Sequence, residues 1–191
     1  MQARRAAREL ALLSLPQLPT QPQNLDTKTF DDLLTAVVRA LTEEAKDHLE
    51  MARAELQKAQ REKIYEEQLE SVLQYVEQAI NQTHWALEFP LLVQLVNREE
   101  TRSYAIELLK TVHANKEMIN KAIATALVKW ELHRLPQIDR DILRLATAEM
   151  FFLGIPKEVA INEAVELAKR YSTEDGYRFI NAILRKVAPP Y

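Results

Sequence analysis

Three arginines stand close together near the start of the chain: Arg4, Arg5 and Arg8, in the segment MQARRAARELALLSL. Residues four apart share one face of a helix, so Arg4 and Arg8 point the same way with Arg5 beside them. Cations at a helix N-terminus oppose the helix dipole, at a cost of roughly 0.3–1 kcal/mol each when they are exposed. The pattern leaves two interpretations, a plain solvated basic face and a face that binds an anionic ligand such as a phosphate.

A second basic group lies near the end of the chain, where Arg178, Arg185 and Lys186 accompany the aromatic residues Tyr177 and Phe179. Cations beside aromatic rings suit single-stranded RNA, because bases stack on the rings while the cations hold phosphates. Phe179 also fits a position in the core, which the helical spacing alone favours. The sequence therefore offers a candidate RNA surface with one ambiguous aromatic residue.

Residue types that carry catalysis or hold metals are sparse. His48, His84, His113 and His133 are not at metal-ligand spacing, and no HExxH, CxxC, GxSxG or glycine-rich phosphate motif occurs. The absence of cysteine excludes disulfides and thiolate sites, and it suits a reducing compartment such as the cytoplasm. We therefore expect a protein that is not an enzyme and that needs no metal and no cofactor.

Glu149 is the one acid that lies among apolar neighbours, in the segment ATAEMFF. A buried carboxylate requires a partner, because an unpaired charge away from water is costly. We predict an internal ion pair here rather than a catalytic acid. The candidate partners are Arg140, Arg144 and Arg178.

Composition and periodicity favour an all-α protein. The chain has 191 residues, only two glycines and a net charge of −3. Apolar residues recur at helical spacing, and no run of about 18 apolar residues predicts a membrane span. Because the whole chain is mildly acidic, any nucleic-acid site must be a local basic patch.

The segment 135–186 organises the rest, because it predicts three consecutive helices that bury their apolar stripes against one another. Pro136 opens the first helix, Gly154 ends it, and Pro156 suits the first turn of the second. Ser172 followed by Asp175 predicts a side-chain cap for the third helix.

The middle of the chain predicts an appendage: a proline-rich linker at 16–29 and an inserted acidic helical arm at 30–82. The arm reads as a helical hairpin joined near residues 61–64. Nine acids and five bases between Leu41 and Glu70 favour a protein contact or a structural role over RNA binding. Its two predicted apolar seams are Val38, Leu41, Ala45, Leu49, Ala52, Leu56 and Ala59, and Tyr65, Leu69, Val72, Val76 and Ile80.

Several separated segments, in this order, resemble the NusB transcription antitermination family: ARRAARELALLSL, KWELHRLPQIDRDILRLATAEM, AINEAVELAKRY and EDGYRFINAILRK. The resemblance covers residues 1–15 and roughly 98–188, and it is weak or absent across 16–97. It implies a compact all-α fold of two small helical bundles. On this view residues 1–191 form a single domain that contains the linker and the arm.

The resemblance also implies a function. Members of the family bind the boxA element of ribosomal RNA leader transcripts as a heterodimer with the ribosomal protein NusE. The complex joins the RNA polymerase elongation complex and other Nus factors so that terminators are read through, and some members self-associate as homodimers. Carried over by position, the RNA contacts are Arg4, Arg5, Arg8, Asp175, Arg178 and Phe179, and Asp139 falls at the acid that looks towards NusE.

This sequence departs from the family pattern at several positions. Pro16 stands where relatives often carry an aromatic residue, Ala148 replaces a common tyrosine, and Ala182 replaces a common glycine. Two alternatives remain beside an RNA-binding antitermination factor. One is a non-catalytic protein-interaction scaffold built on the arm. The other is a relative of the N-terminal RNA-binding domain of ribosomal RNA cytosine methyltransferases.

Overall fold

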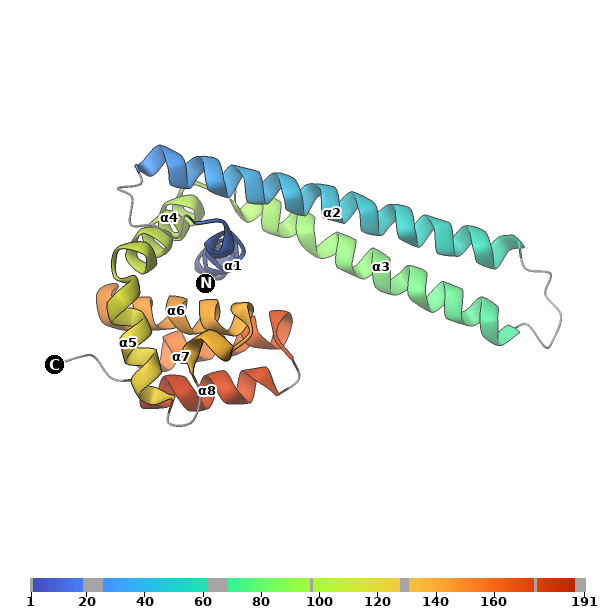
Figure 1. The fold of residues 1–191 in the computed structure, drawn as a ribbon. Coiled ribbons are helices and arrows are strands. Elements are labelled where there is room, and N and C mark those ends of the chain that lie inside the picture. The colour runs from blue at the N-terminus through green and yellow to red at the C-terminus, as the bar shows by residue number, and fades with distance from the viewer. Residues whose placement is uncertain are drawn as a thin grey trace. The chain divides into compact units, whose positions relative to one another are not determined.

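The computed structural model describes residues 2–18, 26–61, 69–96, 98–127, 131–173 and 175–187. These ranges contain helices and no strand, so the predicted all-α class is confirmed (Figure 1). None of their helices combines the length and apolarity that crossing a bilayer requires. The helices are α1 (Gln2–Ser14), α2 (Thr27–Arg61), α3 (Leu69–Val96), α4 (Glu99–Ala114), α5 (Lys116–Ala126), α6 (Gln137–Phe152), α7 (Lys157–Tyr171) and α8 (Gly176–Lys186), with 3-10 turns η1 (Leu15–Gln17) and η3 (Leu132–Arg134).

The chain divides into two compact units. We call Met1–Leu34 with Glu99–Tyr191 the body, and Thr35–Arg98 the arm. Helix α3 continues through Pro90. Residues 19–25 of the predicted linker and 62–64 of the predicted hairpin junction lie outside the described residues.

The three helices predicted over 135–186 are present as α6, α7 and α8. Gly154 ends α6 with φ 64°, the left-handed conformation common at helix exits, and the N–H of Ile155 bonds back to the carbonyl of Glu149 at 3.1 Å. The predicted cap of α8 is wrong. Asp175 precedes the helix without a side-chain cap bond, and the hydroxyl of Ser172 donates to Asp139 instead.

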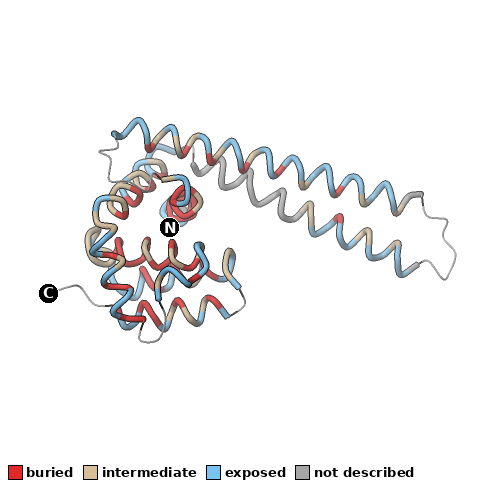
Figure 2. The backbone as a smooth tube through the Cα atoms, viewed as in Figure 1, coloured by how far each residue is buried: buried red, intermediate tan, exposed pale blue. Residues whose placement is uncertain are grey.

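Helix α1 is a core helix of the body rather than a surface appendage. Ala7, Leu10, Ala11 and Leu12 are fully buried, and α1 packs on α4 and α6. Burying a leucine is worth about 1.5–3 kcal/mol relative to leaving it exposed. Figure 2 shows buried positions throughout the body helices, which is where the largest buried side chains lie.

A buried ion pair joins α1 to α6. The Nε of Arg8 lies 2.8 and 3.0 Å from the two carboxylate oxygens of Glu149, and the two side chains are only 6% and 2% exposed. The predicted internal ion pair of Glu149 is therefore confirmed, but its partner is not one of the three arginines expected. The partner comes from the opposite end of the sequence, and the chain's own fold brings it there.

Two further groups complete this buried cluster. The hydroxyl of Tyr104 on α4 donates to Glu149, and the Nη1 of Arg8 lies 3.3 Å from Glu163 on α7. Burial raises the pKa of Glu149, and the charge of Arg8 opposes that rise. Burial, followed by the bond to Glu149, raises the pKa of Tyr104, so its hydroxyl stays protonated as a donor. One cluster thus ties together α1, α4, α6 and α7.

The substitution Arg8→Met should lower the free energy of unfolding by about 3–5 kcal/mol near neutral pH, because it leaves Glu149 charged and buried without its cation. A carboxyl whose pKa is raised on folding binds more protons in the folded state, so its contribution to stability falls as pH rises through that raised value. Without Arg8 the pKa of Glu149 rises further. The deficit should therefore shrink between about pH 7 and about pH 5, which urea unfolding followed by circular dichroism measures.

The matched control is Arg5→Met, which removes an arginine one turn away whose side chain is 56% exposed. An exposed ion pair contributes less than about 1 kcal/mol, so this variant should unfold close to the wild type. Equal losses for Arg5→Met and Arg8→Met, or a deficit for Arg8→Met that does not change with pH, would contradict the assignment of Arg8 to the buried pair.

The substitution Gly154→Ala should cost about 1 kcal/mol of stability, because an alanine at this left-handed φ is strained. A Cβ at this position meets nothing within 4 Å, so strain is the only term. Gly154→Asn should lose less, since asparagine tolerates the left-handed region. Thermal unfolding of the two variants measures the difference, and an alanine variant as stable as the asparagine variant would count against it.

Candidate nucleic-acid interface

Arg4 and Arg5 are exposed on the first turn of α1. The guanidinium carbon of Arg4 lies 5.2 Å from the ring centroid of Tyr104. Arg5 makes two bonds of 3.2 Å to Glu163, which is also the first cause of its raised pKa. The structure therefore places two cations at the surface where the dipole of α1 is already positive.

Arg8 lies inside the body. It is 5% exposed, and its guanidinium is engaged by Glu149 and Glu163 and lies 5.8 Å from the Tyr104 ring. Four residues of helix place Arg8 on the same face as Arg4 but one turn deeper, where neighbouring helices cover it. Of the three arginines predicted to contact RNA, the structure brings two to the surface and buries the third.

The predicted residues of the last helix are at the surface. Side chains of Asp175 and Arg178 are 91% and 72% exposed, and their charged atoms are 3.6 Å apart. The Arg178 guanidinium lies 5.6 Å from the ring of Tyr177. Phe179 is half-buried, between the core position that its spacing favoured and an open surface position. It lines an apolar hollow of about 210 Å³ together with Leu135, Pro136, Asp139, Thr173, Asp175 and Gly176.

Asp139, the predicted contact with a protein partner, is only 5% exposed. Its carboxylate accepts the hydroxyl of Ser172 and reaches the surface through the hollow beside Phe179. A Cβ on Gly176 would lie 2.0 Å from the Ser172 oxygen, so only glycine allows α8 to begin this close. Asp139 therefore fixes the start of α8 from within.

A second hollow, of about 260 Å³, lies at the end of α1 and contains Pro16. Lys116, Arg140 and Arg144 also line it, with Asp141 as the acid among them. Burial raises the pKa of Asp141, and the charge of Arg144 opposes that rise from 2.9 Å away. These cations line the same hollow as Pro16, the position where relatives often carry an aromatic residue.

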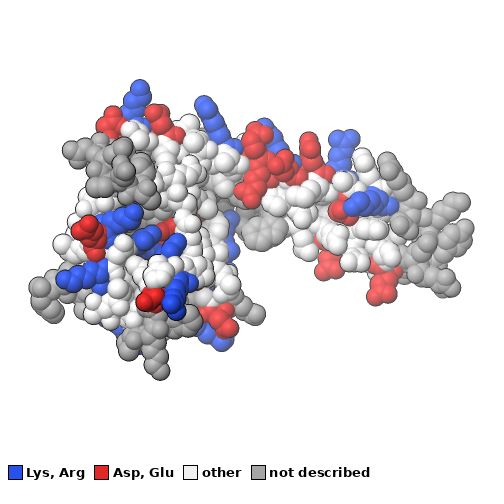
Figure 3. All heavy atoms as spheres, in the orientation of Figure 1, with Lys and Arg blue, Asp and Glu red and all other residues white. Residues whose placement is uncertain are grey.

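Helices α1 and α8, which carry the two groups of predicted RNA contacts, both pack against α6. Figure 3 shows basic and acidic side chains interspersed on the viewed face of the body. The viewed face of the body therefore carries no broad basic surface among the described residues. Among the described residues, no cluster of three or more histidine or acidic side chains could hold a metal ion.

Sequence reasoning missed the residues that support the arginines. Tyr104 lies under Arg4 and bonds Glu149, and Glu163 accepts both Arg5 and Arg8. A parallel cluster joins Glu9 to the hydroxyl of Tyr171 and to Arg170, the latter at 3.0 Å. No local pattern identifies these partners, because they come from helices far apart in the sequence. The spacing of Arg4 and Arg8 was the only signal, and it could not say which one is covered.

Comparison with known proteins shows what this chain is similar to. Residues 67–189 match the model of the NusB family. Transcription antitermination protein NusB of Microcystis aeruginosa is 48% identical over 97% of this chain and 91% of its own length. The NusB protein of Trichodesmium erythraeum is 46% identical over 96% of this chain and 94% of its own length. These alignments extend through the arm, so the resemblance is not confined to residues 1–15 and 98–188.

Two solved structures are also similar to this chain. Thermotoga maritima NusB is 31% identical over 76% of this chain and 89% of that chain, with a TM-score of 0.46. A protein chain in the crystal structure of a plectonemic RNA supercoil is 19% identical over 98% of this chain and 94% of that chain. Its TM-score of 0.53 is a likeness of fold alone. On the family match and the extent of the curated relatives, the chain belongs to the NusB family.

Proposed function

We propose that this protein is a non-catalytic, RNA-binding transcription antitermination factor. It binds single-stranded boxA-type RNA of ribosomal RNA leader transcripts together with NusE. With other Nus factors it supports read-through by RNA polymerase in the cytoplasm. The observation that carries the proposal is the pair of exposed arginines, Arg4 and Arg5, on a helix of a NusB-family chain whose position is fixed by a buried third arginine.

The first turn of α1 binds the RNA backbone. Arg4 and Arg5 add two charges to the positive end of the helix dipole, so a phosphate lowers the electrostatic cost of both. Arg5 exchanges the exposed carboxylate contact with Glu163 for a charge-assisted bond to phosphate. Arg4 keeps its place over the Tyr104 ring, which limits the rotamers that it loses on binding.

The start of α8 supplies the second contact. The Nε of Arg178 donates to the hydroxyl of neighbouring Tyr177 at 3.1 Å. Its ion pair with Asp175, at 3.6 Å, is exposed, so it contributes little and yields readily to a phosphate. Half-buried Phe179 offers part of its ring to a base, and base–aromatic stacking is worth about 1–3 kcal/mol. Asp139 contributes to the NusE contact by fixing this turn through Ser172.

The double variant Arg4→Ala/Arg5→Ala should bind a labelled boxA-type RNA more weakly than the wild type. Each lost phosphate contact should make the slope of log K against log salt shallower by about 0.7 for a single strand. Fluorescence anisotropy across a salt series, with and without NusE, measures both effects. Arg8 stays untouched, because its loss would destabilise the body that positions the other two.

The matched control is Lys46→Ala/Lys58→Ala, which removes the same charge from exposed, ion-paired lysines of the arm. It should leave both the affinity and the salt slope within error of the wild type. An unchanged salt slope for the Arg4/Arg5 double variant would remove α1 from the interface. Equal effects of the two double variants would mean that Arg4 and Arg5 affect RNA binding only through the net charge of the protein.

A further inference from the structure

The arm exposes more large apolar side chains than the body does. Among the described residues, five of the seven exposed large hydrophobic residues belong to it. Leu49, Leu56 and Ile80 were predicted to lie on the hairpin seam, yet they are 48%, 45% and 62% exposed. Leu41, Ala45 and Ala52 of α2 are buried, as the predicted seam required, and Ala79 of α3, which was not predicted, is buried as well.

The exposed residues share one flank of the hairpin. His48 and Gln82 each lie three positions after a seam alanine, Ala45 and Ala79, and they bond to each other. Three residues at 100° each equal a rotation of about −60° around the helix axis. A residue rotated this way from the seam therefore lies on the same flank of the hairpin in both antiparallel helices. Residues rotated the other way lie together on the opposite flank.

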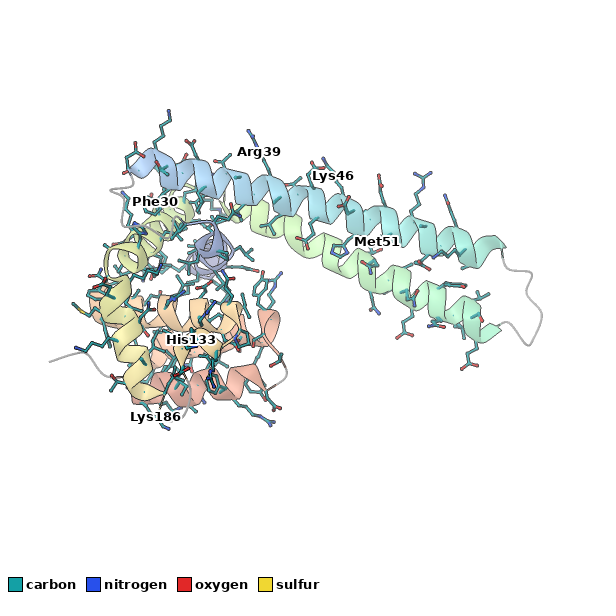
Figure 4. All side chains as sticks on the ribbon, in the orientation of Figure 1. Phe30, Arg39, Lys46, Met51, His133 and Lys186 are labelled. Atoms are coloured by element: carbon teal, nitrogen blue, oxygen red, sulfur yellow. The ribbon has the colours of Figure 1, made fainter. Side chains whose placement is uncertain are left out.

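Four large residues are rotated that other way. Leu49 and Leu56 lie four positions after seam alanines, about +40° from the seam. Ile80 follows Ala79 directly, and Leu73 lies seven residues before Ile80 on the same side of α3. We call Leu49, Leu56, Leu73 and Ile80 the apolar flank. Met51 is equally exposed but lies on the other side of α2, and Figure 4 labels it together with Lys46.

Charges of opposite sign border the apolar flank at the same height. Two contacts set the register of the hairpin, His48 with Gln82 and Lys58 with Tyr75. Position 53 is midway between 48 and 58, so Arg53 stands level with the middle of 75–82 on α3. Glu77 lies at that height on the outer edge of α3. Glu50 is also exposed on this edge of α2, one turn from Arg53, so the complementarity rests on one pair of opposite charges, Arg53 on the α2 side and Glu77 on the α3 side.

We infer that a second copy of this chain docks on the apolar flank. A two-fold axis parallel to the arm sets α2 of each copy against α3 of the other and makes an antiparallel four-helix bundle. The leucines and Ile80 form its core. The stem of Arg53 covers the partner's apolar edge, and its guanidinium meets the partner's Glu77. Self-complementary charge is what selects a second copy over another protein, because the same face presents both signs in register.

The size of the flank fits a weak, reversible dimer. It runs for roughly 20 Å along two helices that together are about 20 Å wide, or on the order of 500 Å² per copy. That area lies at the small end of specific interfaces, so dissociation in the micromolar range is expected. The surface belongs to the arm alone and does not depend on the RNA contacts of α1 and α8.

Sedimentation velocity of the full chain across a micromolar concentration series tests the inference. The wild type should pass from monomer to dimer as concentration rises. Arg53→Glu and Glu77→Arg should each raise the dissociation constant at least about tenfold, because each sets like charges opposite one another. The double variant Arg53→Glu/Glu77→Arg should restore it to within about threefold of the wild type.

Leu56→Ser, on the flank, should weaken the dimer by about tenfold or more, whereas Met51→Ser, on the other side of α2, should leave it within about twofold. Circular dichroism checks that each variant keeps its helix content, which changes at exposed positions should not disturb. A wild type that stays monomeric throughout overturns the inference. So does a dimer that the charge exchange fails to restore, or one that loses as much with Met51→Ser as with Leu56→Ser.

Discussion

The buried pair of Arg8 and Glu149 is the constraint on which the rest of the body depends. It places a full charge of α1 in the interior, where the charge persists only because Glu149, Tyr104 and Glu163 meet it from three other helices. Such a pair adds little net stability compared with apolar packing, but breaking it is costly. Its effect is therefore to specify one position and rotation for α1. Because Arg4 and Arg5 lie on the same helix, the buried pair also fixes where these exposed arginines lie on the surface.

The division of labour among the arginines follows from helix geometry. Arg4 and Arg8 share a face, yet one turn separates an exposed cation from a buried one. The cost of gathering cations at a helix N-terminus is met in two ways here. Arg8 is neutralised inside the body, while Arg4 and Arg5 remain at the surface for an anionic ligand. A chain with a net charge of −3 can thus keep a local site for RNA.

Much of the fold could be predicted from the sequence. Apolar residues at helical spacing predicted α6, α7 and α8, and Pro136, Gly154 and Pro156 marked the boundaries of α6 and α7. Partners between distant helices could not be predicted in this way. Arg8 was not a candidate for Glu149, since nothing local links residues 141 positions apart. Ser172 was read as a cap because its spacing to Asp175 fits one, but Asp139 competes for its hydroxyl. On the arm, the apolar stripe of α2 is wider than the surface that α3 covers. The heptad-like spacing alone therefore did not tell which leucines face solvent.

The most direct measurement of the central claim is hydrogen–deuterium exchange of the full chain with and without a single-stranded boxA-type RNA and NusE. If α1 is fixed by its buried arginine and presents its first turn to the transcript, RNA should slow exchange in the peptides that cover α1 and the start of α8. The arm should exchange at the same rate in both states. Protection of the arm, with α1 unchanged, would contradict the account.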